Sequence, residues 1–366
     1  MNFTHLHVHS NFSLLDGAAS VYDLVEAAAD MGMEALALTD HNGLYGAVRF
    51  CQAAIEAGIK PIIGAELTVE PLIGRSKPQK SDNPEALPSP LRHQPHLLLL
   101  AEDNEGYSNL CRLVTAARLG VAQYAGPFSE DFSHVDRDNP VLPQADLRKY
   151  SSHLIALSGC PRGEIPQLIM AGDRRRAARV AQYYKGLFGP ENFYTELQNN
   201  LLPPPYHILR HRLGELAEHV DVKTVATNNV HYVDRDHARL QDVLVCINNN
   251  QAVDEPHPDR KVNCEYDLKS PAQMAGLFPD QPEAVRNTQR IAERCHPELD
   301  LEHFHFPAFD LQMLQEEDCG HYPPPRDGEN EREYLRRLCY AGAKWRYGDI
   351  TPEVGQRLEH ELQIIQ

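Results

Sequence analysis

The stretch Thr4-His5-Leu6-His7-Val8-His9-Ser10 lies three residues from the start of this 366-residue chain. Alternate side chains of an extended strand share one face, so His5, His7 and His9 are expected to project together. A single histidine in an apolar strand is usually a satisfied core residue. Three at this spacing favour a metal site, because histidine is the commonest metal ligand. We therefore predict that this strand forms one wall of a metal site.

The segments that follow alternate between strand and helix through about residue 250. This rhythm predicts a parallel sheet with right-handed crossovers. Seven strands fit a closed βα barrel better than an open doubly wound sheet, although sequence alone separates these poorly. The predicted strands cover residues 3–8, 34–38, 60–64, 96–101, 153–157, 192–198 and 223–227, and the predicted helices cover 21–31, 43–57, 104–118, 162–171, 174–187, 205–218 and 235–247.

Two changes of composition suggest how the chain is divided. Residues 71–95 are rich in Pro, Ser, Lys and Arg and are expected to form a surface loop insertion. Beyond about 270, helices joined by Pro-rich loops replace the strand–helix rhythm. We therefore expect domains over 1–270 and 271–366. The apolar stripe of the last helix still runs at Gln366, which suggests a cut inside a larger protein.

Composition excludes several classes of protein. With 35 basic and 52 acidic residues the net charge is -17, so any nucleic-acid contact must be local. The eight cysteines show no Cys-x-x-Cys pairing, which indicates reduced thiols in the cytoplasm. No signal peptide and no apolar run long enough to span a membrane is visible, so no membrane partner is expected.

Polar residues follow the predicted strands where those strands end, and His96 begins one. In βα barrels the carboxyl ends of the strands form the active-site face. Taken singly, Asp16 and Asp40 fit turn formers equally well, Cys160 fits a small buried hydrophobe, and Glu66 fits a solvated strand end. Taken together they favour a metal site, with candidate ligands Asp16, Asp40, His41, Glu66, His96, Cys160, Asn229 and His231 in addition to the first-strand histidines.

These ligands are too many for one tetrahedral ion and enough for two or three. Histidine, carboxylate and thiolate ligands suit zinc or manganese, with iron as a further candidate. Neighbouring divalent ions are used to hydrolyse phosphate esters.

The same residues resemble the motifs of the PHP (polymerase and histidinol phosphatase) family. Its four motifs correspond to His7-Val-His9, Thr39-Asp40-His41, His96 and Asn229-Val-His231. The chain is most similar to the N-terminal part of bacterial C-family DNA polymerases, the DNA polymerase III α subunit and its error-prone relatives. Segments that carry this similarity are 5–17, 64–66, 96–107, 157–164, 268–271, 291–295 and 347–352.

The resemblance implies a distorted seven-stranded βα barrel with a site for two or three divalent ions, followed by the start of a polymerase palm. It implies that His7, His9, Asp40 and His41 are catalytic by holding the ions, and that His5 only supports them. Asn229 is a neutral ligand and would bind one ion more weakly than Asp. The implied ligand set is His7, His9, Asp16, Asp40, His41, Glu66, His96, Cys160, Asn229 and His231.

The implied activity is a metal-dependent 3′–5′ exonuclease used in replication or repair. The implied partners are a DNA 3′ end, the palm and fingers of the polymerase, and other replisome subunits. Polymerase catalysis is not expected, because no Gly-Arg-Gly-Ser segment or strand Asp-x-Asp pair occurs here. Two alternatives are a non-catalytic scaffold of the polymerase and a free-standing phosphatase for a small phosphomonoester such as histidinol phosphate.

Overall fold

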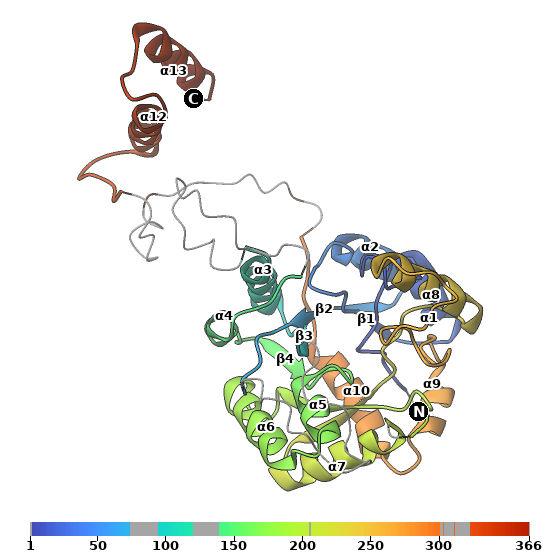
Figure 1. Cartoon of the computed structure of the whole chain (residues 1–366). Coiled ribbons are helices and arrows are strands. Elements are labelled where there is room, and N and C mark those ends of the chain that lie inside the picture. The colour runs from blue at the N-terminus through green and yellow to red at the C-terminus, as the bar shows by residue number, and fades with distance from the viewer. Residues whose placement is uncertain are drawn as a thin grey trace. The chain divides into compact units, whose positions relative to one another are not determined.

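The computed structural model describes residues 2–73, 94–119, 139–204, 206–300 and 323–365, together with His303 and Leu311. The chain forms two compact units, one of Met1–Gly120 with Val135–Leu299 and one of Val121–His134 with Asp300–Gln366. The first unit carries all the described strands (Figure 1).

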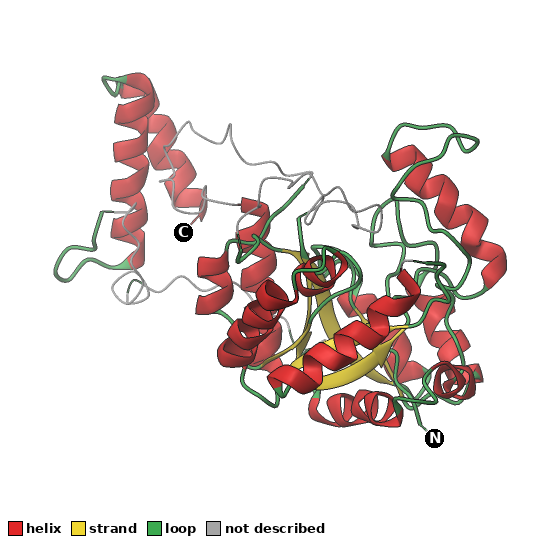
Figure 2. Ribbon diagram, turned by 60° about the horizontal axis from the view of Figure 1, so that its bottom comes forward, coloured by secondary structure: helices red, strands yellow, loops and turns green. Residues whose placement is uncertain are grey.

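A six-stranded sheet forms the interior of the first unit, and helices surround it (Figure 2). Leu97 and Leu99 contact one buried cluster, whereas Leu98 and Leu100 contact another. Burial on both faces explains the continuous apolar run of this strand. In chain order, which is also the order in the sheet, the strands are β1 (Ala35–Leu38), β2 (Lys60–Thr68), β3 (His96–Ala101), β4 (Leu154–Leu157), β5 (Phe193–Gln198) and β6 (Lys223–Thr227).

The sheet curls around an apolar interior. This interior cluster takes side chains from all six strands, among them Ala37 of β1, Leu98 of β3 and Val225 of β6, and also Leu6. The two edges of the sheet also come together, because residues 5–9 hydrogen-bond with β1 on one side and with Val230, beyond β6, on the other. The α/β class and barrel-like architecture predicted from the sequence are therefore confirmed.

The prediction of an all-parallel sheet is wrong for β3. This strand is antiparallel to both β2 and β4, with Thr68 opposite His96 and Ala101 opposite Leu154. The other neighbouring pairs are parallel. A parallel neighbour needs a long crossover, whereas an antiparallel neighbour does not. Residues 74–93, which hold most of the predicted loop insertion, lie outside the described residues.

The predicted first strand, over 3–8, is an extended segment rather than a regular strand, so seven strands are not confirmed within the described chain. On one side, the amides of Ala37 and Thr39 donate to the carbonyls of His5 and Val8, at 2.9 and 2.8 Å. The two donors are two positions apart and the two acceptors are three positions apart, so this pairing interrupts a regular ladder.

On its other side, the extended segment pairs with the chain beyond β6. The amide of His9 donates to the carbonyl of Val230 at 2.8 Å, and the amide of Val230 donates to the carbonyl of His7 at 3.0 Å. The segment therefore links the β1 edge of the sheet to the residues after β6.

The helices of the first unit pack mainly on the outer face of the sheet. The first of them begins at Ser20, whose hydroxyl accepts a hydrogen bond from the amide of Asp23 at 3.2 Å, and ends before Gly32. The helices are α1 (Val21–Asp30), α2 (Ala47–Glu56), α3 (Asn104–Leu119), α4 (Gln144–Lys149), α5 (Glu164–Met170), α6 (Arg174–Phe188), α7 (Leu209–Val220), α8 (Ala238–Asn248), α9 (Pro271–Leu277) and α10 (Pro282–Arg294), with short 3-10 turns at Tyr206–Ile208 and Arg235–His237.

Helix α10 belongs to the first unit although it follows the expected domain boundary at 270. Its Ile291 and Ala292, with Cys295 just beyond it, join the interior cluster of the sheet. The compact unit accordingly extends to Leu299. The identity of 271–366 as the start of a palm stays a prediction.

The second unit contains two described helices, α12 (Glu331–Tyr347) and α13 (Pro352–Ile365). Asn330 caps α12 by accepting from the amides of Arg332 and Glu333, at 3.1 and 3.0 Å. Arg336 of α12 pairs with Glu359 of α13 at 2.6 Å. Among the described helices of the chain, none is long and apolar enough to cross a membrane.

Candidate metal centre

His7 and His9 point into the same buried space. Their Nε2 atoms are 3.1 Å apart, and both side chains are fully buried. His5 does not join them, because its Nε2 lies 2.8 Å from the carbonyl oxygen of Lys269 and its ring packs edge-on against Phe3. Two of the three histidines expected to face the site, His7 and His9, therefore do so, whereas His5 contacts the surrounding fold.

Glu66 lies at the centre of the histidines. Within the described chain neither of its oxygens accepts a hydrogen bond, and both are buried. The alternative of a solvated strand end is therefore wrong, and β2 continues past Glu66 to Thr68. The nearest nitrogens are His7 Nε2 at 3.4 Å from Oε1, and His9 Nε2 at 3.5 Å, His41 Nδ1 at 3.1 Å and His96 Nδ1 at 3.3 Å from Oε2.

The reversed direction of β3 explains how His96 reaches Glu66. His96 is the first residue of β3 and pairs with Thr68 near the carboxyl end of β2. Because the two strands are antiparallel, the amino end of β3 meets the same edge as the carboxyl end of β2.

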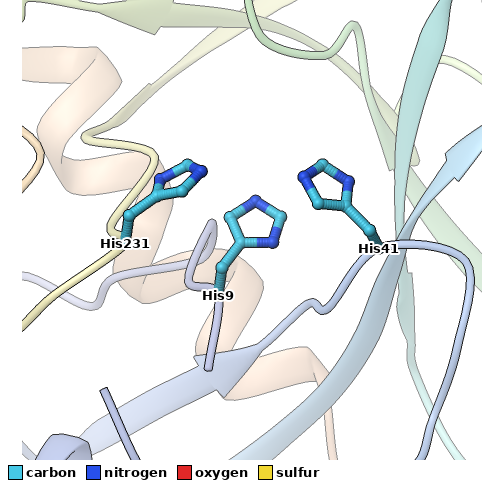
Figure 3. Close-up of side chains that lie close together, drawn as sticks. All are labelled: His9, His41 and His231. Atoms are coloured by element: carbon cyan, nitrogen blue, oxygen red, sulfur yellow. The ribbon is translucent and has the colours of Figure 1, made fainter. Parts of the chain in front are cut away.

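Asp16 joins the cluster from the loop after the extended segment. Its Oδ2 lies 3.1 Å from His41 Nε2 and 3.0 Å from His231 Nε2. Gln241 of α8 donates to Oδ1 at 2.8 Å, a contact that the sequence did not predict. The rings of His9, His41 and His231 lie side by side (Figure 3), with that of His9 4.2 Å from His41 and 4.6 Å from His231 between centroids.

Asn229 presents an amide to the same cavity. It has a left-handed backbone with φ 52°, which asparagine tolerates better than most residues, and its Oδ1 is buried without a hydrogen bond in the described chain. Its backbone carbonyl lies 2.8 Å from Nδ1 of His231. A neutral imidazole that donates through Nδ1 keeps the lone pair of Nε2 for a ligand.

Cys160 lies beside His96, with Sγ 3.7 Å from Nδ1. The loop reaches this position through Gly159, which has φ 88° and comes so close to His96 that an added Cβ would lie 2.5 Å from its carbonyl oxygen. Cys160 is buried, as expected of a small hydrophobe, but its sulfur contacts a candidate ligand.

Asp40 is not brought into the cluster. Its Oδ1 accepts from the amide of Ser10 and the hydroxyl of Ser13, both at 2.7 Å, and its Oδ2 accepts from the hydroxyl of Ser10 at 2.8 Å. Ser13 Oγ in turn lies 3.0 Å from Nδ1 of His9. Asp40 thus fixes the turn that orients His9, and its predicted role as a direct ligand stays a prediction.

Glu196 of β5 is a site residue that sequence reasoning missed. Its Oε1 lies 2.7 Å from Nδ1 of His7, and both side chains are fully buried. The signal available in the sequence was a carboxylate inside the predicted strand 192–198.

The charges of the site hold both of its central carboxylates ionised. Burial alone would raise the pKa of Glu66, but the positive field of His96, His7 and His41 outweighs it and holds that pKa well below its usual range. Burial alone would also raise the pKa of Asp16. His231 and His41 outweigh it, so the pKa of Asp16 is lowered as well.

The histidines differ because their neighbours differ. Burial would lower the pKa of His7, but Glu196 and Glu66 raise it to about 10. Burial and the neighbouring His41 and His231 hold the pKa of His9 well below its usual range. Burial, reinforced by the charge of Glu66, raises the pKa of the Cys160 thiol well above its usual range.

The residues fit a divalent metal site. Three overlapping groups each bring their ligand atoms within 4.8 Å of one another: His9 with His41 and His231, His7 with His9 and Glu66, and His41 with Glu66 and His96. Ligands bound tetrahedrally to zinc at about 2.0–2.2 Å lie roughly 3.3–3.6 Å apart, close to the spacing around Glu66. The buried Glu66 oxygens without hydrogen-bond donors supply the anionic oxygen that such an ion needs. We name His7, His9, Asp16, His41, Glu66, His96, Cys160, Asn229 and His231 the Glu66 cluster.

The Glu66 cluster opens into a cavity of about 530 Å³. Three cationic residues, Arg162, Arg260 and Lys261, line the cavity together with the cluster. Arg162 pairs with Asp259, and Arg260 pairs with Asp242 at 2.6 Å. The ammonium of Lys261 instead lies over a ring, with Nζ 4.6 Å from the centroid of Tyr266.

Comparison with known proteins agrees with the family resemblance. The model of the PHP domain family matches residues 5–200. The chain is 43% identical over 368 residues to an error-prone DNA polymerase of Symbiobacterium thermophilum, covering 100% of this chain and 30% of that protein. It is 34% identical over 365 residues to the DNA polymerase III subunit alpha of Treponema pallidum, covering 100% of this chain and 28% of that protein. It therefore spans less than a third of the length of these two polymerases.

A solved structure from Bacteroides vulgatus, described as a two-domain protein containing a predicted PHP-like metal-dependent phosphoesterase, is a more distant match. The similarity covers 63% of this chain and 52% of that one, at 16% identity and a TM-score of 0.35.

Proposed function

Because this chain belongs to the PHP domain family, we propose that the Glu66 cluster is a metal centre that hydrolyses phosphodiester bonds at DNA 3′ ends. The observation that carries the proposal is Glu66 itself, a buried carboxylate with no hydrogen-bond donor in the described chain and with four imidazoles around it. Bound divalent ions would lower the pKa of a water molecule and stabilise charge on a phosphoryl group.

The overlap of the ligand groups supports two or three ions. Glu66 belongs to two of the groups and presents a different oxygen to His7 than to His41 and His96. We propose zinc or manganese, with iron as a further candidate, because imidazole and carboxylate ligands dominate.

The chain's own residues hold and orient the groups that bind the ions. Asp16 connects His41 to His231, while the carbonyl of Asn229 orients His231 through Nδ1. Asp40 and Ser13 orient His9 in the same way. Cys160 would bind as a thiolate, since a divalent ion favours deprotonation of a coordinating thiol.

The substrate class is proposed from the cavity and from the relatives. The relatives matched over the whole chain are named as DNA polymerases, which supports DNA as the substrate. Lys261 lines the cavity beside the cluster, and its ammonium would contact a backbone phosphate of such a substrate. We propose that the chain works in the cytoplasm with the palm and fingers of a polymerase and with replisome subunits.

The test uses the full chain supplied with Mn²⁺ or Zn²⁺ and single-stranded DNA labelled at its 3′ end. Wild-type protein is expected to release the labelled terminal nucleotide, and His9→Ala is expected to abolish release. The matched control is His237→Ala, since this half-exposed histidine pairs with Asp234 at 3.6 Å outside the cluster. Equal release by wild type and His9→Ala would contradict the proposal. A metal-loaded wild type that releases nothing would instead support a scaffold.

A further inference from the structure

We propose that Glu196 is a positioning residue that fixes the orientation and tautomer of His7 for metal binding. The inference rests on the metal centre of the proposed function but not on exonuclease activity. It begins from the contact between Oε1 of Glu196 and Nδ1 of His7, at 2.7 Å with both side chains fully buried.

The contact decides which nitrogen of His7 can bind a metal. A neutral imidazole carries one N–H, and an ionised carboxylate can only accept. In the neutral form that binds a metal, His7 must therefore donate through Nδ1 to Glu196, which leaves the lone pair on Nε2. That Nε2 is the atom that faces the cluster, 3.4 Å from Oε1 of Glu66 and 3.1 Å from Nε2 of His9.

Glu196 is itself held firmly in place. Its backbone lies in β5, and its amide donates to the hydroxyl of Ser158 at 2.9 Å. Gln198 donates to Oε1 at 2.7 Å, and Thr227 of β6 donates to the same oxygen. Two neighbouring strands therefore fix the carboxylate before any ion binds.

The charge of Glu196 distinguishes His7 from His9 and His231, the other two histidines of the cluster whose Nε2 atoms face its interior. The Nδ1 atoms of His9 and His231 lie beside neutral groups, the hydroxyl of Ser13 and the carbonyl of Asn229. Burying a carboxylate is costly unless its charge is compensated. A histidine that donates a hydrogen bond to a carboxylate becomes a more basic metal ligand. Raising the basicity of His7 would therefore be the function of the buried charge of Glu196.

Glu196 also borders a small cavity. Its Oε2 accepts no hydrogen bond within the described chain, and the residue lines a small cavity of about 30 Å³ with Cys160 and Gln198. A cavity of this size holds roughly one or two water molecules.

The test measures metal affinity rather than activity. Chelator-stripped full-length chain is titrated with Zn²⁺ against a chromophoric chelator, and its Co²⁺ form is examined by absorption spectroscopy. Glu196→Ala is expected to weaken binding by about 10–100-fold. Glu196→Gln keeps an oxygen that accepts from Nδ1 but loses the charge, so an intermediate affinity and a shifted Co²⁺ spectrum are expected.

A second buried glutamate provides the control. Glu164 is equally buried but accepts from the amides of Leu72 and Ile73, at 3.0 and 2.9 Å, and does not belong to the cluster. Glu164→Gln is expected to keep wild-type metal affinity and spectrum. If Glu196→Ala fails to fold by circular dichroism, Thr227→Val, which removes one donor to the carboxylate, tests the same point with a smaller expected loss.

The outcomes separate this inference from the proposed function. Wild-type affinity and spectrum in folded Glu196→Gln and Glu196→Ala would overturn the positioning role, whatever the nuclease assay shows. If these variants bind metal more weakly while the wild-type chain binds metal but releases no nucleotide, the positioning role is supported and the exonuclease is contradicted.

Discussion

Glu66 and Asp40 are both buried carboxylates, but they contact different partners. Glu66 is surrounded by imidazole nitrogens without a hydrogen-bond donor in the described chain, whereas Asp40 accepts three hydrogen bonds from Ser10 and Ser13. The sequence predicted both as ligands because both lie near strand ends. The positions of the serine donors in three dimensions separate the two roles.

This difference predicts opposite behaviour of two conservative variants. Glu66→Gln is expected to lose bound metal, because an amide cannot supply the central negative charge. Asp40→Asn is expected to keep its metal and to lower the free energy of unfolding by about 1–3 kcal/mol, because hydrogen bonds to a charged acceptor are weakened. Metal per chain by atomic spectroscopy and urea unfolding measure the two effects. Loss of metal in Asp40→Asn at unchanged stability would restore Asp40 as a direct ligand.

Lys261 is the residue for which a substrate effect is expected. Lys261→Ala should raise KM for single-stranded DNA several-fold with little change in kcat, since a backbone phosphate is held alike in ground and transition states. The slope of log KM against the logarithm of the salt concentration should also decrease by about 0.7. Lys149 is the control, because its Nζ also lies over a tyrosine ring, 5.0 Å from the centroid of Tyr150, but it does not line the cavity. An equal effect of Lys149→Ala would contradict a specific contact.

At the scale of elements, the direction of β3 was the main feature that the sequence did not predict. Its apolar run, from Leu97 to Ala101, predicted a strand but did not indicate the direction of that strand. Most of the connection that precedes β3, residues 74–93, lies outside the described residues. The reversal nevertheless places His96 at the predicted edge. In a parallel sheet His96, the first residue of its strand, would lie at the opposite edge, so it is the reversal of β3 that brings it beside Glu66.

The Cys160 loop provides a prediction at the same scale. Gly159 and Gly172 both have positive φ, 88° and 76°, but an added Cβ would meet the carbonyl oxygen of His96 at 2.5 Å only in the case of Gly159. Gly172→Ala is expected to cost about 1 kcal/mol of unfolding free energy from backbone strain. Gly159→Ala should cost more and also weaken metal binding, because Cys160 and His96 must move apart. Unchanged metal affinity in Gly159→Ala would show that this loop does not support the cluster.

At the scale of the whole molecule, the pattern of strands and helices predicted the barrel-like unit because its interior is filled by local apolar runs. It could not predict Gln241 or Glu196. These residues act on Asp16 and His7, which are more than 180 positions away along the chain. Such contacts depend on the closure of the sheet rather than on any local spacing.

Metal removal should therefore weaken the first unit as a whole. The Glu66 cluster joins the extended segment, β2, β3 and the residues after β6, so an ion bound only to the folded state stabilises all of them. At a free metal concentration of 100 Kd the expected gain is about 2.7 kcal/mol. Calorimetry with Zn²⁺ or with a chelator should show this shift in wild type and not in His9→Ala. The same shift in both proteins would place the metal elsewhere.

The most direct test of a metal-dependent phosphodiesterase joins metal content to chemistry. Mn²⁺ is titrated into chelator-stripped full-length chain while bound ions per chain and release of the 3′-terminal nucleotide are measured together. The stripped chain is expected to release no nucleotide, and release should rise with metal loading and reach its plateau at two or three ions per chain. Release without metal, or a fully loaded chain that releases no nucleotide, would contradict the proposed function.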